Sequence, residues 1–162
     1  MGSIEQFFPF ESTSEAETMD LGDRVGQLLE SGAIVALIGD LGAGKTHLVK
    51  GIARAFGVAE SDVSSPTFTI AHEYRSRQAS TVTLPGKPNH GKLLYHMDLY
   101  RLNTESELFE AGIEEYLQSG DTCLIEWPEK AGYLLPESTH VLRLRHIANG
   151  NRRVEYVKTI IR

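Results

Sequence analysis

Eight residues in the first third of the chain have the types and the spacing that a phosphate-binding loop needs. They fit the pattern G-x-x-x-x-G-K-[ST] and are Gly39, Asp40, Leu41, Gly42, Ala43, Gly44, Lys45 and Thr46. Glycines let the backbone turn its N–H groups toward an anion, and the following helix directs its positive end at the same phosphates. In this pattern Lys45 reaches the β- and γ-phosphates, while the Thr46 hydroxyl can bind Mg²⁺. The motif predicts a nucleotide site, and its alternative is a glycine-rich turn that only caps a helix.

Two acidic residues, each at the end of an apolar segment, are candidates for the metal ligand. Asp98 ends the segment LLYHMD, and Glu126 ends CLIE. In a sheet that carries a phosphate-binding loop, the ends of parallel strands meet at one edge, so both carboxylates would lie near the phosphates. Either acid also suits a helix cap or a surface ion pair. The spacing alone leaves open which of them binds the metal.

Two further residues have alternative roles. Thr67, after the proline-fixed turn in SSPTF, has a hydroxyl that could lie near a γ-phosphate as in switch loops, but it also suits a plain loop before a strand. Trp127 directly follows Glu126 and either packs in the core or shields the site from water. The string Asn-Lys-x-Asp that usually marks a guanine site is absent, so the sequence favours ATP over GTP.

The segments around these residues predict an α/β fold. Apolar residues at helical spacing predict helices over 12–32, 46–57 and 104–120, the third with a capping pair of Thr104 and Glu107. Apolar or alternating segments predict strands over 33–39, 67–77, 92–100, 122–127, 139–147 and 152–161. We therefore expect a P-loop NTPase-like sheet, mostly parallel, with helices on both faces and an antiparallel C-terminal pair of strands across Asn149 and Gly150.

Composition limits the classes of protein that fit. The chain has 162 residues, a length that predicts a single domain over 1–162. Of these residues 41% are hydrophobic, and the net charge is −6. No apolar stretch approaches the ~20 residues that cross a bilayer, no secretory signal opens the sequence, and the lone Cys123 excludes an internal disulfide, so we expect a cytoplasmic protein without membrane contact. The acidic balance and the lack of a basic stripe argue against direct nucleic-acid binding as the main activity.

Five longer segments carry a resemblance to a known family. In order along the chain they are GDLGAGKT, SPTFTI with EY, YHMDLYRL, ELFEAGIEEYL and CLIEWPEKA. Together they closely resemble the TsaE family, also called YjeE, the small bacterial ATPases of tRNA threonylcarbamoyladenosine synthesis. The resemblance covers about residues 18–153. It implies a protein that binds ATP with Mg²⁺ and hydrolyses it slowly. It also implies two partner proteins, TsaB and TsaD, that transfer threonylcarbamoyl to the adenosine next to the anticodon. This chain would then contact tRNA only indirectly, through the complex with these partners.

Carried over position by position, the resemblance assigns roles to single residues. It places the Mg²⁺ ligands at Thr46 and Glu126, beside the catalytic Lys45 of the phosphate loop. It gives Asp98 a hydrolytic or supporting role and makes Thr67 switch-like and catalytic. The family's tryptophan falls on Trp127, which together with Thr67 would sense the nucleotide and the partner.

The resemblance is weaker at the two positions implied for contacts to the base. These contacts would lie near Glu15 and Asn151. The chain also departs from the family where residues 76–91 form a longer connection, whose role the sequence does not assign, and where His47 replaces a residue that is often small and hydroxylated. The core of the phosphate-binding motif is intact.

Two other classes of function remain open to the sequence. A small-molecule kinase shares this size and architecture, but it would need an acceptor pocket and usually an arginine-bearing lid, and no arginine-rich lid is evident. A non-hydrolytic scaffold would use ATP only to hold a shape for its partners. Release of inorganic phosphate separates the ATPase from the kinase, and a hydrolysis-dead variant separates it from the scaffold.

Overall fold

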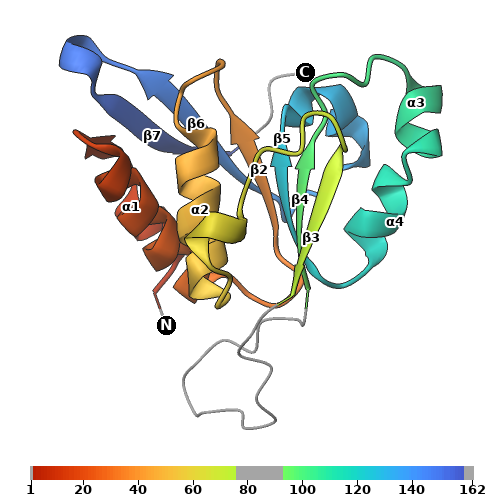
Figure 1. Cartoon of the computed structure of the whole chain (residues 1–162), viewed down its shortest axis with the longest axis horizontal. Helices are drawn as coiled ribbons and strands as arrows, with labels where there is room; N and C mark the ends of the chain where they lie inside the picture. Colours follow the sequence, from red (N-terminus) through yellow and green to blue (C-terminus); the bar gives the residue numbers. More distant parts are fainter. Residues whose placement is uncertain (1, 76–92, 159–162) are drawn as a thin grey trace, which may run out of the picture.

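A computed structural model describes residues 2–75 and 93–158, and these form one mixed sheet between two layers of helices (Figure 1). The sheet order is β1-β7-β6-β2-β5-β4-β3. The strands are β1 (Phe10–Ser12), β2 (Ile34–Ile38), β3 (Ala71–Arg75), β4 (Leu93–Asp98), β5 (Thr122–Glu126), β6 (His140–His146) and β7 (Arg152–Val157). The predicted long connection at 76–91 and the end of the predicted last strand lie outside the described residues.

The four central strands, β6, β2, β5 and β4, are parallel to one another. Both edges are antiparallel: β3 pairs with β4, while β7 pairs with β6 and β1 with β7. The α/β class, the parallel core and the antiparallel C-terminal pair are thus confirmed. The tight connection of that pair contains Asn149 at φ 63° and Gly150 at φ 73°, and asparagine and glycine are the residues that tolerate this left-handed backbone.

Helices cover both faces of the sheet, as predicted. The α-helices are α1 (Glu15–Leu28), α2 (Lys45–Ala55), α3 (Glu105–Glu110) and α4 (Ile113–Gln118), and short 3₁₀ helices span Ile4–Phe7, Glu60–Asp62, Pro128–Leu134 and Ala148–Gly150. Helices α1 and α2 pack on one face, and α3 and α4 pack on the other (Figure 1). In the described part of the chain, no helix combines the length and apolar composition needed to cross a membrane.

Alternating residues of β2 supply two separate cores. Val35 and Leu37 pack with α1 and α2, whereas Ile34 packs with α3 and α4. A strand buried on both faces has no polar side, which explains the uninterrupted apolar sequence at 33–38.

Two predicted elements differ from the structure. The helix expected over 104–120 is two helices, because Gly112 adopts φ 68° and redirects the chain, although the Thr104–Glu107 capping box forms as predicted. The strand expected from Thr67 begins only at Ala71. Residues 67–70 form a turn instead, in which the Ile70 N–H donates to the Pro66 carbonyl at 2.7 Å. The turn matters because it sets the position of Thr67.

Helices α1 and α2 approach each other through glycines. A Cβ added at Gly51 would lie 2.0 Å from the Met19 carbonyl oxygen, and one added at Gly22 would lie 2.3 Å from the Leu48 carbonyl oxygen. Both distances fall far inside van der Waals contact with backbone, which cannot move away as a side chain can. The two helices therefore pack at a separation that only glycine permits, and this fixes the start of α2 relative to the start of α1.

We expect Gly51→Ala to destabilise the protein by about 1–3 kcal/mol, because the new methyl group would push α1 away from α2 and overpack the core. The measurement is the free energy of unfolding in urea, compared with Gly132→Ala, where no atom lies within 4 Å of the added Cβ. Alanine favours a helix over glycine by about 1 kcal/mol. A Gly51→Ala protein more stable than the parent by about that 1 kcal/mol would therefore show that the helix pair separates without cost.

Candidate functional site

The phosphate-binding motif forms the connection from β2 to α2. Gly42 and Gly44 have φ 78° and 102°, in the region that favours glycine. A Cβ at Gly44 would also lie 2.9 Å from Cδ of Arg152. The N-terminus of α2 has no side-chain cap, whereas Ser14 caps α1 through the Glu17 N–H. The first N–H groups of α2 are thus left for an external partner, and a helix N-terminus favours an anion there.

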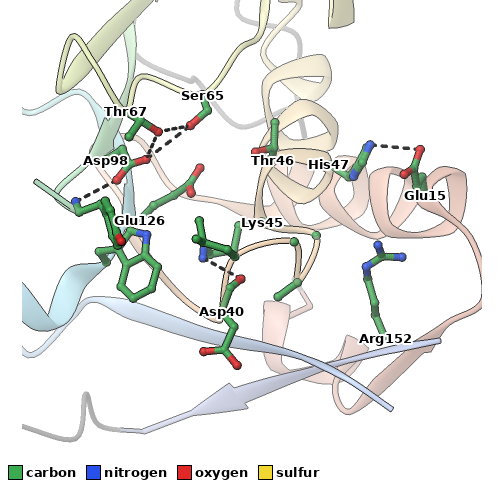
Figure 2. A pocket seen from close by; sticks show the side chains of 16 residues that line it. Glu15, Asp40, Lys45, Thr46, His47, Ser65, Thr67, Asp98, Glu126 and Arg152 are labelled. Atoms are coloured by element: carbon green, nitrogen blue, oxygen red, sulfur yellow. Dashed lines mark hydrogen bonds and ion pairs between the residues drawn. The ribbon is translucent and has the colours of Figure 1, made fainter. Parts of the chain in front are cut away.

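A pocket of about 330 Å³ opens over this connection (Figure 2). The structure brings into its lining the predicted residues Glu15, Asp40, Leu41, Gly42, Ala43, Gly44, Lys45, Thr46, Thr67, Asp98, Glu126 and Trp127. Two predicted residues, Gly39 and Asn151, are not among the lining residues. Four lining residues were not predicted for the site: His47, Ser65, Tyr100 and Arg152.

Strand register brings the two candidate acids to the loop. Asp98 and Glu126 are register partners in β4 and β5, and Glu126 is also the partner of Leu37 near the end of β2. Both acids are the last residues of their strands. They are buried, with 3% and 4% of their surface exposed, so each carboxylate has lost most of its hydration. The strand pairing therefore places two carboxylates, whose burial costs free energy, where the glycine-rich loop begins.

Asp98 is held by hydrogen bonds to both of its carboxylate oxygens. The Thr67 hydroxyl donates to Oδ2 at 2.7 Å, and the Ser65 hydroxyl approaches the same oxygen at 3.4 Å. The Tyr100 N–H donates to Oδ1 at 2.9 Å, and the Asp98 N–H donates to the Ile70 carbonyl at 2.8 Å. Asp98 therefore fixes the turn that carries Thr67 to the end of β4 (Figure 2).

Glu126 contacts a buried histidine instead. His96 Nε2 lies 2.8 Å from Glu126 Oε1, and the side chains are 0% and 5% exposed. The other ring nitrogen, Nδ1, is buried without a hydrogen-bond partner among the described residues. The sequence alone does not place this histidine in the site. The signal that could have found it is the spacing H-x-D, which puts His96 on the same face of β4 as Asp98.

Lys45 is folded back on its own loop. Its Nζ donates to the carbonyl oxygens of Gly39 and Asp40 and lies 4.6 Å from the centre of the Trp127 ring. Burial lowers the pKa of Lys45, and the negative charges of Glu126 and Asp98 oppose that effect. The ammonium is therefore placed among acids, ready to meet further negative charge.

Trp127 covers this lysine because its backbone is left-handed, at φ 56°, a conformation that non-glycine residues rarely adopt. Its ring also packs against Tyr100, with ring centres 5.0 Å apart. Sequence analysis gave Trp127 two alternatives, core packing or shielding of the site. The structure places the ring in the pocket wall, over the lysine.

The far side of the pocket is built from α1, α2 and β7. Glu15 Oε2 lies 3.3 Å from His47 Nε2, joining the first turns of α1 and α2. Arg152 extends from the start of β7 along the phosphate loop, and its Nε is buried without a partner among the described residues. The sequence placed a base contact at Asn151, one position before the residue that lines the pocket. A turn shifts side-chain direction by one residue easily, and spacing alone does not reveal the shift.

The arrangement suits an anion with a divalent cation. One side of the pocket presents the backbone N–H groups of the loop and the Lys45 ammonium. The pocket is also lined by the Thr46 hydroxyl and by the buried carboxylate of Glu126. Among the described residues no group of three or more His, Cys, Asp and Glu could hold a metal by itself. Mg²⁺ commonly takes only one or two protein ligands and completes its shell with phosphates and water. The donor set therefore fits Mg²⁺ bound together with a nucleotide.

Comparison with known proteins gives one consistent result. The family model described as threonylcarbamoyl adenosine biosynthesis protein TsaE matches residues 12–154. The chain is similar to the tRNA threonylcarbamoyladenosine biosynthesis protein TsaE of Treponema pallidum (strain Nichols), at 41% identity over 88% of this chain and 95% of that protein. It is also similar to the protein of that name from Haemophilus influenzae, at 36% identity over 85% of this chain and 79% of that protein.

A solved structure agrees with these matches. The crystal structure of Bacillus subtilis YdiB superposes with a TM-score of 0.67 at 26% identity, over 92% of this chain and 83% of that one. The family match spans the phosphate-binding loop, both strand-end acids and Trp127. The chain belongs to the TsaE family.

Proposed function

We propose that this chain binds ATP with Mg²⁺ in the pocket described above and hydrolyses it slowly. We propose further that it thereby serves the threonylcarbamoylation of the adenosine next to the anticodon of tRNA, acting with TsaB and TsaD. The observation that carries the proposal is the meeting of Lys45 with two buried strand-end acids, Asp98 and Glu126, at a glycine-rich helix start. Membership of the TsaE family supplies the pathway.

Phosphate binding falls to the loop and the start of α2. The N–H groups that lack a cap would receive the phosphate oxygens, and Lys45 would exchange its two carbonyl acceptors for the β- and γ-phosphates. That exchange is favourable because a phosphate carries full charge, whereas a carbonyl carries only a dipole. Lys45 thus needs to move only its ammonium, not its backbone.

Metal binding falls to Thr46 and Glu126. The second residue of α2 brings its hydroxyl to the pocket, opposite the carboxylate at the end of β5. Mg²⁺ bound there would neutralise charge on the transferred phosphoryl group. Thr46 and Glu126 would hold the ion at the phosphate-facing side of the pocket.

Hydrolysis falls to Asp98 and Thr67. Because the Thr67 hydroxyl donates to Asp98, the position of the turn at 65–70 depends on that carboxylate. A γ-phosphate or its attacking water would compete for these same groups, which would let the turn respond to the nucleotide. Of the arginines in the described residues, only Arg152 lines the pocket, and it lies at the far side from Asp98 and Thr67 (Figure 2). Hydrolysis without an arginine at the γ-phosphate is slow.

Substitutions of each acid in turn distinguish the role of Glu126 from that of Asp98. We expect Glu126→Ala to make nucleotide binding far less dependent on Mg²⁺, since the carboxylate ligand is lost. We expect Asp98→Ala to keep Mg²⁺-dependent nucleotide binding and to lose turnover. Calorimetric titration with and without Mg²⁺, together with release of inorganic phosphate, measures both effects. The reverse pattern would mean that the two roles are exchanged.

Arg152, on the far side of the pocket, is expected to contribute to nucleotide binding. We expect Arg152→Ala to weaken nucleotide binding by about 10- to 100-fold, the effect of losing one charge-assisted contact of roughly 1.5–3 kcal/mol. The neighbouring Asn151→Ala is the matched control and should bind as the parent does, because Asn151 does not line the pocket. Equal losses in the two variants would place the contact in the backbone of the turn rather than in the guanidinium.

The partner proteins give a third prediction. If Thr67 and Trp127 sense the γ-phosphate, a TsaB–TsaD complex should bind this chain more tightly with a non-hydrolysable ATP analogue than with ADP. The difference should be ~1–3 kcal/mol, the usual size of such a coupling. Calorimetric titration gives the affinities, and ATPase rates measured with and without the partners give the stimulation. An affinity that ignores the nucleotide, with an unchanged rate, would favour an enzyme that works alone.

A further inference from the structure

We infer that His96 is a positioning residue for the carboxylate of Glu126: it holds one carboxylate oxygen so that the other faces the metal and the phosphates. The inference rests on the proposed function, since it gives His96 a task only if Glu126 binds Mg²⁺. The roles proposed above use neither His96 nor the contact that it makes.

His96 and Glu126 are buried together, which supports this role. The His96 side chain is 0% exposed and that of Glu126 is 5% exposed, with 2.8 Å between Nε2 and Oε1. A histidine needed only for packing would be replaced by an apolar residue without leaving a polar atom unpaired. Here Nδ1 is buried without a partner among the described residues, so the contact with Glu126 is the ring's only hydrogen bond there.

The direction of the hydrogen bond is the second argument. An ionised carboxylate only accepts, so His96 Nε2 carries the proton and donates it to Oε1. The contact thus assigns a proton to Nε2, and Nδ1 has no hydrogen-bond partner among the described residues. Histidines and carboxylates that support a metal ligand act in this way, by fixing the orientation of the ligand.

The position in the sheet is the third argument. His96 lies two residues before Asp98 on β4, and its register partner on β5 is Leu124, two residues before Glu126. The pair therefore crosses diagonally between neighbouring strands, on the face of the sheet that α1 and α2 cover. His96 is the only hydrogen-bond partner of the Glu126 side chain among the described residues, and it occupies Oε1. Oε2 remains for the pocket that Glu126 lines.

The test compares metal dependence in variants of His96. Binding of a fluorescent ATP analogue is measured in EDTA and over a series of Mg²⁺ concentrations. We expect His96→Leu to raise the Mg²⁺ concentration at the midpoint by about 10- to 100-fold while leaving metal-free nucleotide binding unchanged. His96→Gln, whose amide can donate from nearly the place of Nε2, should return the midpoint close to that of the parent.

Leu94→Ala is the matched control, since Leu94 is buried on the same strand and the same face but does not contact Glu126. The inference is overturned if His96→Leu leaves the midpoint unchanged, if Leu94→Ala shifts it equally, or if His96→Gln fails to restore it. A Glu126→Gln variant with the parent's midpoint would instead overturn the proposed metal role of Glu126.

If His96→Leu does not fold, NMR spectroscopy of the parent protein tests the hydrogen bond directly. Long-range ¹⁵N–¹H correlation of the parent, assigned with His96→Gln, should show a proton on Nε2 of His96. The Nε2 resonance should shift in Glu126→Gln. A proton on Nδ1 alone, or a His96 signal indifferent to Glu126→Gln, would contradict the hydrogen bond on which the inference depends.

Discussion

The site depends on one constraint, the parallel register of β4, β5 and β2. That register makes Asp98 and Glu126 partners and brings both to the point where β2 turns into the phosphate-binding loop. A shift of one residue would turn both carboxylates toward the apolar layer under α3 and α4, where nothing could compensate their charge. The alternating apolar residues of the same strands prevent such a shift, since they fill two separate cores.

Charge at this edge of the sheet is balanced rather than absent. Lys45 is buried beside Glu126 and Asp98, and each acid has a further hydrogen-bond partner, His96 for Glu126 and Thr67 for Asp98. The two acids therefore have different surroundings although they occupy equivalent positions. Asp98 is hydrogen-bonded to the turn that carries Thr67, whereas Glu126 is hydrogen-bonded to a histidine buried on the face of the sheet. This difference is the physical basis for giving them different roles.

The sequence predicted most of what local rules determine. The glycine-rich connection from β2 to α2, the capping box of α3 and the Asn149–Gly150 turn each follow from residues close together in the chain. The break at Gly112 and the turn before Ala71 were missed, because one left-handed residue ends an element without changing its apolar pattern. The pairing of His96 with Glu126 and the pocket position of Arg152 depend on strand register and on the geometry of a turn, which spacing along the chain does not encode.

The central claim is that ATP bound at this pocket serves tRNA threonylcarbamoylation, and reconstitution tests it most directly. Purified TsaB and TsaD, threonylcarbamoyl donor, tRNA and ATP are combined over many turnovers with the parent chain, with Lys45→Ala, or with neither, and modified adenosine is counted. The account predicts sustained modification with the parent only, because Lys45→Ala loses the charge that binds the β- and γ-phosphates. Equal modification in all three mixtures, or full activity of Lys45→Ala, would contradict it.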